Sequence, residues 1–362
     1  MTYKKKIAVI GLKGLPAFGG GANVGENLIA QLKEYYDFTV LSISSHTHLK
    51  TGYYNGVKQV VFKSFLGKGG MNTAYYYFVS LLYVMFHKFD VAHLHHAASG
   101  FIAPILKFKC KTVLTVHGLK YGRDKKFNKL LESLSLFSQN IGFKMVDKIV
   151  SVSLHDKEVI ESRCNREVVY IPNGIDGVVL KHKVNEDSYI LFSAGRIYDL
   201  KGLHLLIDAS KKLKLRIKIK IVGDLDRVKE YKKRILESIS GLNVEMLGLI
   251  KDKKELMEIV NNAKLFVFPS LSEAMSMMLL EVVSTKTPII ASDIPANTAI
   301  FSQDELLFFK SGDVDDLSKK LEYALSNMEE MKHRAEKASI KLIENYTWDK
   351  ISKQYQEIYN KL

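Results

Sequence analysis

Two glutamates, Glu273 and Glu281, lie eight residues apart around an apolar stretch, directly after a strand-like run that ends at Phe268. In an open α/β sheet, ligands bind at the carboxyl ends of strands, where the next helix offers free N–H groups to a phosphate. A helix beginning near Ser276 would leave Glu273 in the preceding loop and place Glu281 inside the helix. One acid could then address a sugar or a phosphate, and the other a ribose. Glu273 could equally be a helix-start acid, whereas Glu281 on its apolar segment needs a ligand or an ion-pair partner.

A pair of cations follows another strand-like run in the same half of the chain. The segment A-G-R-I-Y-D-L-K-G places Arg196 and Lys201 at the mouth of the same kind of crevice. Arg can bind two phosphate oxygens at once, and Lys supplies a mobile point charge. Two cations alone are weak evidence, but at a strand end beside the two glutamates they favour a phosphate site.

The first half of the chain carries glycines and histidines at the ends of its expected strands. Gly19 and Gly20 stand in G-L-K-G-L-P-A-F-G-G-G before an expected helix, where backbone could approach a phosphate or a sugar. This pattern is not G-x-G-x-x-G and lacks the acid that reads a dinucleotide ribose, which disfavours a nicotinamide dehydrogenase. His117, followed by Gly118, could donate to a phosphate or a sugar hydroxyl, or could simply end its strand.

Three further histidines stand in H-L-H-H, at positions 93, 95 and 96. They suggest a metal site, but no acid cluster accompanies them. We therefore favour a cluster at a strand end that faces a cleft, and we expect no metal.

Composition describes a globular protein with two domains. The chain has 362 residues, of which 47% are hydrophobic and 25% charged. No signal peptide is expected, and Cys110 and Cys164 suggest neither a disulfide framework nor a zinc site. A reducing cytoplasm is the expected setting.

The net charge of +14 is uneven. Residues 1–175 hold 23 Lys+Arg and 11 Asp+Glu, whereas residues 176–362 hold 30 and 28. The basic first half favours an anionic partner such as a phospholipid surface, although it could be only a solvated lysine-rich surface. The longest apolar run, Ala74 to Phe86, is too short to span a bilayer and is either a core helix, which we favour, or an interfacial one.

Strand-like and helix-like segments alternate through both halves, which predicts an α/β fold of two Rossmann-like, doubly wound parallel-sheet domains. The first half has strands expected at 7–10, 38–43, 57–62, 91–94 and 112–116, and helices at 25–35, 73–87, 101–108 and 127–146. The second has strands at 189–193, 217–222, 244–247, 265–268 and 289–291, and helices at 203–213, 228–239, 254–260 and 277–284. The domains are predicted as residues 1–172 and 173–345, and a C-terminal helix over 346–362 is expected to pack back on the first. The stretch 314–362 is expected to be helical throughout.

Taken together, these motifs resemble the family 4 glycosyltransferases of the GT-B fold over essentially the whole chain. The resemblance rests on Gly19-Gly20, His117-Gly118, I-P-N-G-I-D from Ile171, G-R-x(4)-K-G from Gly195, E-x(7)-E from Glu273, A-S-D-I-P from Ala291, and the terminal helix with Trp348. The stretch H-G-L-x-x-x-R-x-K further resembles bacterial members that build capsules, exopolysaccharides, O-antigens and other surface glycans.

The resemblance implies two domains facing a central cleft and a retaining, metal-independent transfer from a nucleotide-diphosphate sugar, with a UDP-sugar favoured and no cofactor. Arg196 and Lys201 would neutralise the diphosphate, Glu281 would hold the ribose, and Glu273 would meet the sugar and phosphate. The other donor-binding positions it implies are Gly19, Gly20, Leu249, Ser276 and Met277. His117 would lie near the reacting end of the sugar, and the implied catalytic set is His117, Glu273, Arg196 and Lys201.

The implied acceptor is lipid-linked or a polysaccharide, bound through Tyr121, Arg123 and Lys125 at the inner face of a plasma membrane. Peripheral contact with an anionic membrane is expected, and no nucleic-acid partner. Ala274, Lys286 and Ala299 depart from the usual family pattern, which leaves the donor sugar open. Two alternatives are a nucleotide-sugar epimerase of the same fold and a non-enzymatic binder of anions or nucleic acid.

Overall fold

The computed structural model describes residues 3–67, 69–119, 129–177 and 188–362. The chain forms two compact units, the first made of Met1–Gly174 and Trp348–Leu362 and the second of Ile175–Thr347. The chain thus passes into the second unit two residues after the predicted boundary and returns to the first at Trp348. The C-terminal helix belongs to the first unit.

An eight-stranded sheet forms the centre of the first unit, in the order β3-β4-β2-β1-β5-β6-β7-β8. Its strands are β1 Lys6–Lys13, β2 Asp37–Ile43, β3 Gly52–Tyr54, β4 Val57–Phe62, β5 Val91–His95, β6 Lys111–Val116, β7 Lys148–Ser151 and β8 Val169–Tyr170. All pairs are parallel except β3 with β4, an edge hairpin that the predicted all-parallel sheet missed. Asn55 and Gly56 turn this hairpin with positive φ angles of 49° and 81°, as a tight hairpin turn requires.

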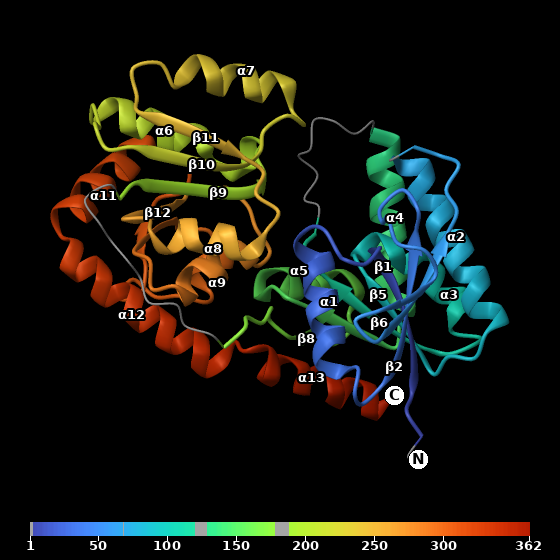
Figure 1. The fold of residues 1–362 in the computed structure, drawn as a ribbon. Helices are drawn as coiled ribbons and strands as arrows, with labels where there is room; N and C mark the ends of the chain where they lie inside the picture. Colours follow the sequence, from blue (N-terminus) through green and yellow to red (C-terminus); the bar gives the residue numbers. More distant parts are fainter. Residues whose placement is uncertain (1–2, 68, 120–128, 178–187) are drawn as a thin grey trace. The chain divides into compact units, whose positions relative to one another are not determined.

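Helices cover both faces of this sheet (Figure 1). They are α1 Gly20–Leu32, α2 Gly70–Phe86, the 3₁₀ helix η1 Ala97–Ile102, α3 Ala103–Leu106, α4 Lys129–Met145, α5 Leu154–Cys164 and α13 Trp348–Lys361. The single helix expected over 101–108 is instead the end of η1 followed by the short α3. In η1 the chain packs closely on α4, where a Cβ on Gly100 would lie 2.5 Å from Cα of Gly142.

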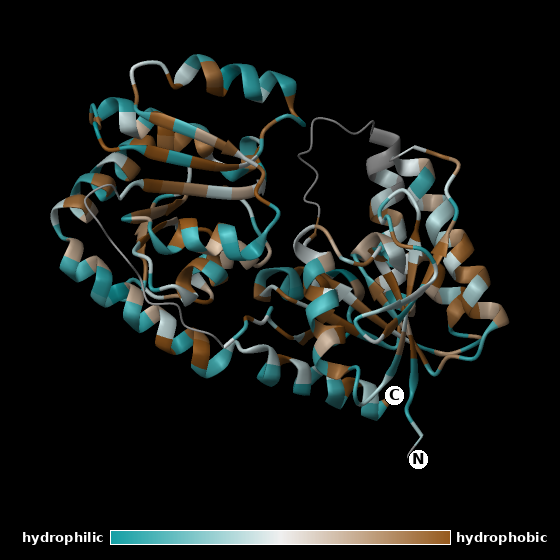
Figure 2. Ribbon diagram, in the orientation of Figure 1, coloured by the Kyte–Doolittle hydropathy of each residue, from teal (hydrophilic) through white to brown (hydrophobic). Residues whose placement is uncertain are grey.

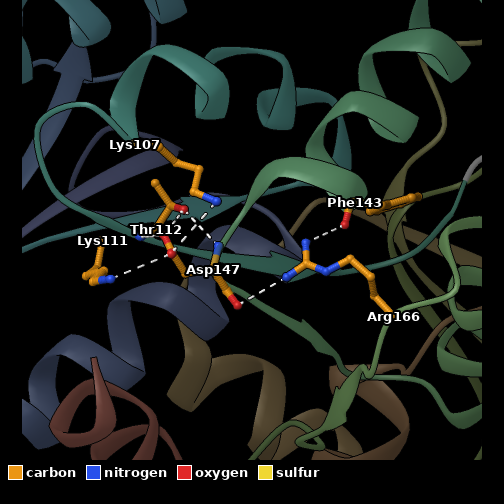
Figure 3. A network of polar contacts seen from close by, with 6 residues as sticks. All are labelled: Lys107, Lys111, Thr112, Phe143, Asp147 and Arg166. Carbon is orange, nitrogen blue, oxygen red and sulfur yellow. Dashed lines mark hydrogen bonds and ion pairs between the residues drawn. The ribbon is translucent and has the colours of Figure 1, made fainter.

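The core on one face joins α2, η1, α3 and α4 to the strands through buried side chains such as Tyr76 and Phe143. A polar network anchors this layer (Figure 3). Thr112 donates to Asp147 Oδ2 from its backbone N at 2.9 Å and from its hydroxyl at 2.7 Å. Arg166 Nη1 donates to the carbonyl of Phe143 at 2.8 Å, near the end of α4. The network fixes the end of α4 against the starts of β6 and β7.

The C-terminal helix α13 packs with α1, on the other face. Tyr36 donates its hydroxyl to Asn360 Oδ1 at 2.7 Å, and Lys5 Nζ donates to the carbonyl of Tyr359 at 2.8 Å. Trp348 is buried against Gly174, where a Cβ would come within 2.7 Å of the indole ring. The last helix is therefore an integral part of the first unit.

The second unit has a six-stranded, wholly parallel sheet in the order β11-β10-β9-β12-β13-β14. The strands are β9 Ile190–Arg196, β10 Ile219–Asp224, β11 Val244–Gly248, β12 Leu265–Phe268, β13 Ile289–Ser292 and β14 Leu307–Phe309. The helices are η2 Asp199–Lys201 (3₁₀), α6 Leu203–Lys212, α7 Lys229–Ser238, α8 Lys253–Asn261, α9 Met277–Ser284, α10 Pro295–Thr298, α11 Val314–Ser326 and α12 Met328–Asn345. A core of buried side chains joins β9, β10 and β12 to α6, α7 and α11.

The prediction of one continuous helical stretch over 314–362 is wrong, because the chain forms α11, α12 and α13 with two breaks. At the first break, Asn327 leaves helical geometry and its side-chain amide donates to the carbonyl of Tyr323 at 2.8 Å. At the second, Ile175 N donates to the carbonyl of Tyr346 at 2.8 Å, and Ile175 forms a parallel bridge with Thr347. Competing hydrogen bonds thus end each helix.

Both sheets reverse their winding direction at one place. In the first unit the chain moves outward from β1 to β2 and then returns to β5 on the other side of β1. In the second it moves outward from β9 through β10 to β11 and then returns to β12 beside β9. Ligands of doubly wound sheets bind outside the carboxyl ends of strands at such switch points. The structure therefore indicates one candidate position in each unit.

Candidate functional site

Lys201 and Glu273 meet at the switch point of the second unit. Lys201 ends η2, just after β9, and Glu273 lies in the loop after β12. Lys201 Nζ lies 2.5 Å from Glu273 Oε1, and both side chains are largely buried. The sequence predicted that both residues bind a ligand, and the structure brings them into direct contact.

A close backbone approach holds this pair in place. Gly202 has a φ of 69°, and a Cβ there would lie 1.9 Å from the carbonyl oxygen of Pro269. Leu271 N donates to the carbonyl of Leu200 at 2.8 Å. Only glycine allows the turn after β9 to lie this near the loop after β12.

Arg196 and the start of α9 complete an anion-favouring surface in the second unit. Arg196 is the exposed last residue of β9. Ser276 caps α9 by accepting from Leu279 N at 3.4 Å, and Met277 begins the helix, as predicted. The first turn of α9 carries no acid, so its N–H groups and dipole favour an anion.

Glu281 lies inside α9 and forms an ion pair that the sequence did not reveal. Its Oε1 lies 3.4 Å from Nζ of Lys253, the first residue of α8, and Lys253 Nζ also donates to Asp176 Oδ2 at 3.1 Å. Burial raises the pKa of Glu281, and Lys253 partly offsets the effect. Burial alone would lower the pKa of Lys253, but Glu281 and Asp176 raise it. Asp176 belongs to the I-P-N-G-I-D motif. Because Lys253 lies far from it in the sequence, no local pattern predicted the contact between the two side chains.

Leu249 follows β11 directly and is half-buried. Gly248 before it has a φ of 69°, which turns the chain toward the start of α8 at Lys253. The predicted donor-binding residue Leu249 therefore lies in the loop that leads to Lys253, the partner of Glu281.

At the switch point of the first unit, the glycine loop leads into α1. Gly19 is the N-cap of α1 with a φ of 111°, and the first turn of the helix holds no acid. A Cβ on Gly20 would meet nothing within 4 Å, whereas one on Gly21 would lie 2.8 Å from Cγ of His117. The glycine that close packing requires is therefore Gly21, which is absent from the predicted site.

His117 lies directly after β6 and is stacked on His95. Nε2 of His117 lies 3.0 Å from Nδ1 of His95, and the two rings are nearly parallel, with an interplanar angle of 8°. Burial, reinforced by His95 and His96, holds the pKa of His117 well below its usual range. Nδ1 of His117 is buried, with no hydrogen-bond partner among the described residues. His117 is thus a neutral imidazole that can donate or accept one further hydrogen bond.

His93 is a core residue, and its predicted place in a cluster facing a cleft is wrong. Its Nδ1 lies 2.7 Å from the hydroxyl of Tyr359 on α13, and its Nε2 lies 2.7 Å from that of Thr115. Burial, with a smaller effect of His117, lowers the pKa of His93 to about 3. Within the described ranges, no group of three or more His, Cys, Asp or Glu side chains is placed to hold a metal ion.

The predicted acceptor-binding residues Tyr121, Arg123 and Lys125 lie outside the described residues. Just before them, Leu119 N donates to Asp156 Oδ2 at 3.0 Å, and Asp156 N bonds to the hydroxyl of Ser153 at 3.2 Å. Asp156, which the sequence did not single out, thereby fixes the turn that follows His117.

Two family models match the chain in succession. The model described as Glycosyltransferase Family 4 matches residues 18–177, and the one described as Glycosyl transferases group 1 matches residues 179–341. The chain belongs to the group 1 glycosyltransferases. The switch-point residues of the second unit lie inside the group 1 match, and those of the first lie inside the family 4 match.

Relatives of this group 1 glycosyltransferase include an uncharacterized glycosyltransferase of Methanocaldococcus jannaschii, 25% identical over 96% of each chain. An Escherichia coli UDP-Gal:alpha-D-GlcNAc-diphosphoundecaprenol alpha-1,3-galactosyltransferase is 24% identical over 60% of this chain and 61% of its own.

Solved structures share the fold. Sucrose-phosphate synthase of Thermosynechococcus elongatus matches with a TM-score of 0.85 and 17% identity over 99% of both chains. HepE of Anabaena, in complex with UDP and glucose, matches with a TM-score of 0.78 and 16% identity over 99% of this chain and 100% of that one. The predicted GT-B fold of two parallel-sheet α/β domains is confirmed.

Proposed function

We propose that this glycosyltransferase moves a sugar, with retention of anomeric configuration, from a nucleotide-diphosphate donor to a lipid-linked or polysaccharide acceptor in surface-glycan synthesis. The observation that carries the proposal is the switch point of the second sheet. There, Arg196 and the ion pair of Lys201 with Glu273 share one strand-end region with the start of α9. Glu281 follows within the same helix, where it can accept hydrogen bonds from ribose hydroxyls.

These groups suit the charge that develops during transfer. As the bond between the sugar C1 and the β-phosphate oxygen breaks, negative charge grows on the diphosphate, which Arg196, Lys201 and the α9 terminus stabilise. The acceptor oxygen bonds to C1, and its proton passes to the departing phosphate oxygen. Glu273 and Glu281 are each paired with a lysine, which supports binding roles over that of a nucleophile. The reaction as proposed uses neither metal nor cofactor.

A UDP-sugar is the proposed donor. The names of two similar proteins support this choice, since the Escherichia coli relative uses UDP-Gal and the HepE structure contains UDP. The nucleotide base of the donor would bind along the backbone near Leu249. The lipid diphosphate acceptor in the name of the Escherichia coli relative supports a lipid-linked acceptor here.

The first unit is proposed to bind the acceptor through Tyr121, Arg123 and Lys125 and to contribute His117, Gly19 and Gly20 to transfer. As a neutral group, His117 would supply a hydrogen bond rather than a charge. We place the reaction in the cytoplasm, in peripheral contact with an anionic membrane and without a nucleic-acid partner. The basic first half of the sequence supports this setting.

The test is incubation with UDP-, GDP- and ADP-sugars, with and without lipid-linked acceptors, followed by NMR of the product. We expect a UDP-sugar to be consumed and the new linkage to keep the donor's anomeric configuration. Absence of transfer, hydrolysis and binding across the panel would refute the proposal. An isomerised sugar formed without an acceptor would instead support an epimerase. Salt-sensitive binding of nucleic acid without donor binding would support the non-enzymatic alternative.

A further inference from the structure

The outer face of α2 is apolar although it is exposed. The helix contains no charged residue in its 17 positions. Met71, Phe78, Leu82 and Phe86 project from one side, and their exposed fractions include 76% for Met71 and 82% for Phe86. The helical repeat places these four on one face, opposite the buried Tyr76, Ser80 and Val84. A helix that is apolar all round is normally buried in a core or in contact with lipid.

The apolar surface continues from α2 onto its neighbours. The helix packs against η1 and α3. Phe101 in η1, Ile105 in α3 and Phe108, two residues after α3, are exposed. Tyr77 of α2 meets Phe101 edge to face, with ring centroids 5.7 Å apart. We call the exposed side chains of Met71, Phe78, Leu82, Phe86, Ile105 and Phe108 the α2–α3 face. Figure 2 shows hydrophobic colour over parts of α2 and α3, with paler and hydrophilic positions between them.

Exposed apolar side chains are concentrated here. Of the 22 large hydrophobic side chains that are exposed among the described residues, nine lie between residues 65 and 108. Scattered exposed hydrophobics are normal, but six of these nine belong to the α2–α3 face, on or next to helices that pack against each other, and such a concentration is typical of an interaction surface. The patch therefore calls for a partner.

Positive charge surrounds this face. Residues 57–111 contain seven lysines and a single acid, Asp90. Asp90 is occupied, since its Oδ2 accepts from Lys6 N and from the hydroxyl of Tyr3, both at 2.7 Å. Lys63, Lys88 and Lys109 are exposed, and Lys63 lies over the ring of Phe65, with 5.2 Å between Nζ and the ring centroid.

Asp147 does not reverse this charge. Its side chain is held inward by the two hydrogen bonds from Thr112, and it lies 4.0 Å from each of Lys107 and Lys111 (Figure 3). One carboxylate is thus shared between two ammonium groups, and the rim keeps a net positive charge.

We propose that the α2–α3 face docks on an anionic phospholipid bilayer, with its apolar side chains entering the interface and its lysines contacting the headgroups. Phe and Leu on one side of a helix with lysines at its borders suit this position. A second copy of the chain fits less well, because a two-fold contact through this face would bring two lysine rims together. Within the described ranges, no helix is long and apolar enough to cross a bilayer, so contact would be peripheral. This inference rests on the proposed function, because a lipid-linked acceptor would bring the enzyme to a membrane.

Flotation of the full chain with vesicles tests the proposal, using phosphatidylcholine alone or mixed with phosphatidylglycerol. We expect binding to the anionic vesicles that weakens as salt is raised. Phe78→Gln combined with Phe86→Gln should weaken binding by roughly tenfold or more, because two exposed rings no longer enter the interface. Lys88→Gln combined with Lys109→Gln should weaken it by about tenfold at low salt. Tyr53→Gln, which changes a ring that is 79% exposed elsewhere in the same unit, and Lys233→Gln in the second unit should change nothing.

Three outcomes overturn the proposal. They are no binding to anionic vesicles, binding that the paired phenylalanine variant leaves intact, and a wild-type dimer in solution that this variant converts to monomer. Thermal shift with UDP, run on the same samples, separates this test from that of the proposed function. Vesicle binding without UDP binding would refute only the proposed function, and UDP binding without vesicle binding would refute only the docking surface. Unchanged urea unfolding, followed by the fluorescence of Trp348 in the same unit, shows that the phenylalanine variant is folded.

Discussion

At the scale of single residues, the contact between Lys201 and Glu273 is where a donor diphosphate would compete for the lysine. We expect Arg196→Ala and Lys201→Ala each to lower kcat/KM by roughly 100-fold or more, because in the proposed mechanism each of these two cations stabilises the charge of the leaving group. Steady-state kinetics with the donor found in the panel measure the effect. Lys233→Ala, an exposed lysine on α7, is the matched control and should be unchanged. Near-normal turnover in both site variants would contradict the assignment.

Buried His93 links the stability of the first unit to pH. Its pKa is lowered to about 3 in the folded protein, whereas a histidine in an unfolded chain titrates near 6.5. Below about pH 6.5 only the unfolded chain binds this proton, so the stability that His93 contributes is present above pH 6.5. It falls by about 1.4 kcal/mol per unit as the pH drops toward 3.

Urea unfolding followed by the fluorescence of Trp348 checks this dependence. Trp348 is the only tryptophan and is buried in the first unit, so its signal reports that unit. His93→Gln should reduce the loss of stability between pH 7 and about pH 5, and part of the slope should remain because the pKa of His117 is also lowered. His333→Gln, a change in an exposed residue of α12, should leave the slope as it is. An unaltered slope in His93→Gln would show that His93 does not cause it.

At the scale of elements, the turn at Gly202 holds η2 against the loop after β12. Gly202→Ala adds a Cβ that would lie 1.9 Å from the carbonyl of Pro269, so it should shift Lys201 and lower both stability and kcat/KM. Gly241→Ala is a matched control, because Gly241 also has a positive φ, of 84°, but no atom within 4 Å of the added Cβ. Thermal melting and kinetics should separate the two. Equal losses would mean that the close approach has no special role.

At the start of α1, the neighbouring glycines Gly20 and Gly21 differ in the space around an added Cβ. Gly21→Ala should destabilise the first unit by about 1–3 kcal/mol, because its Cβ would press on the ring of His117 at 2.8 Å. Gly20→Ala has open space around the Cβ and should leave the unfolding free energy unchanged. Urea unfolding reported by Trp348 measures both. If Gly20→Ala proved the more destabilising, the packing of α1 on His117 would be misassigned.

Periodic strands and helices were predictable from the sequence, but elements set by long-range contacts were not. The start of α9 near Ser276 was predicted from the apolar run that follows, and the structure adds that Ser276 caps the helix. Strand β8 has only two residues and exists because it pairs with β7, which no local pattern reveals. In the site, Glu281 was recognised as an acid in need of a partner, but Lys253 could not be assigned to it without the fold.

At the scale of the whole molecule, two units of one architecture have different surfaces. The alternation of segments predicted two α/β domains, each built on a mainly parallel sheet. It did not reveal that the apolar run from Ala74 to Phe86 is core on one side and exposed on the other, because α2 has apolar residues all round. When a helix has apolar residues on all sides, its sequence does not show which side is buried, because that depends on the elements that pack against it.

The measurement that tests the central claim most directly is a thermal-shift titration of the intact chain with UDP, GDP and ADP, repeated on Lys201→Ala. We expect UDP to stabilise the wild-type protein by about 2.7 kcal/mol at 100 times its dissociation constant, and to stabilise the variant much less. If no nucleotide diphosphate raised the melting temperature, or if UDP stabilised Lys201→Ala as much as wild type, the donor site assigned to the second unit would be wrong.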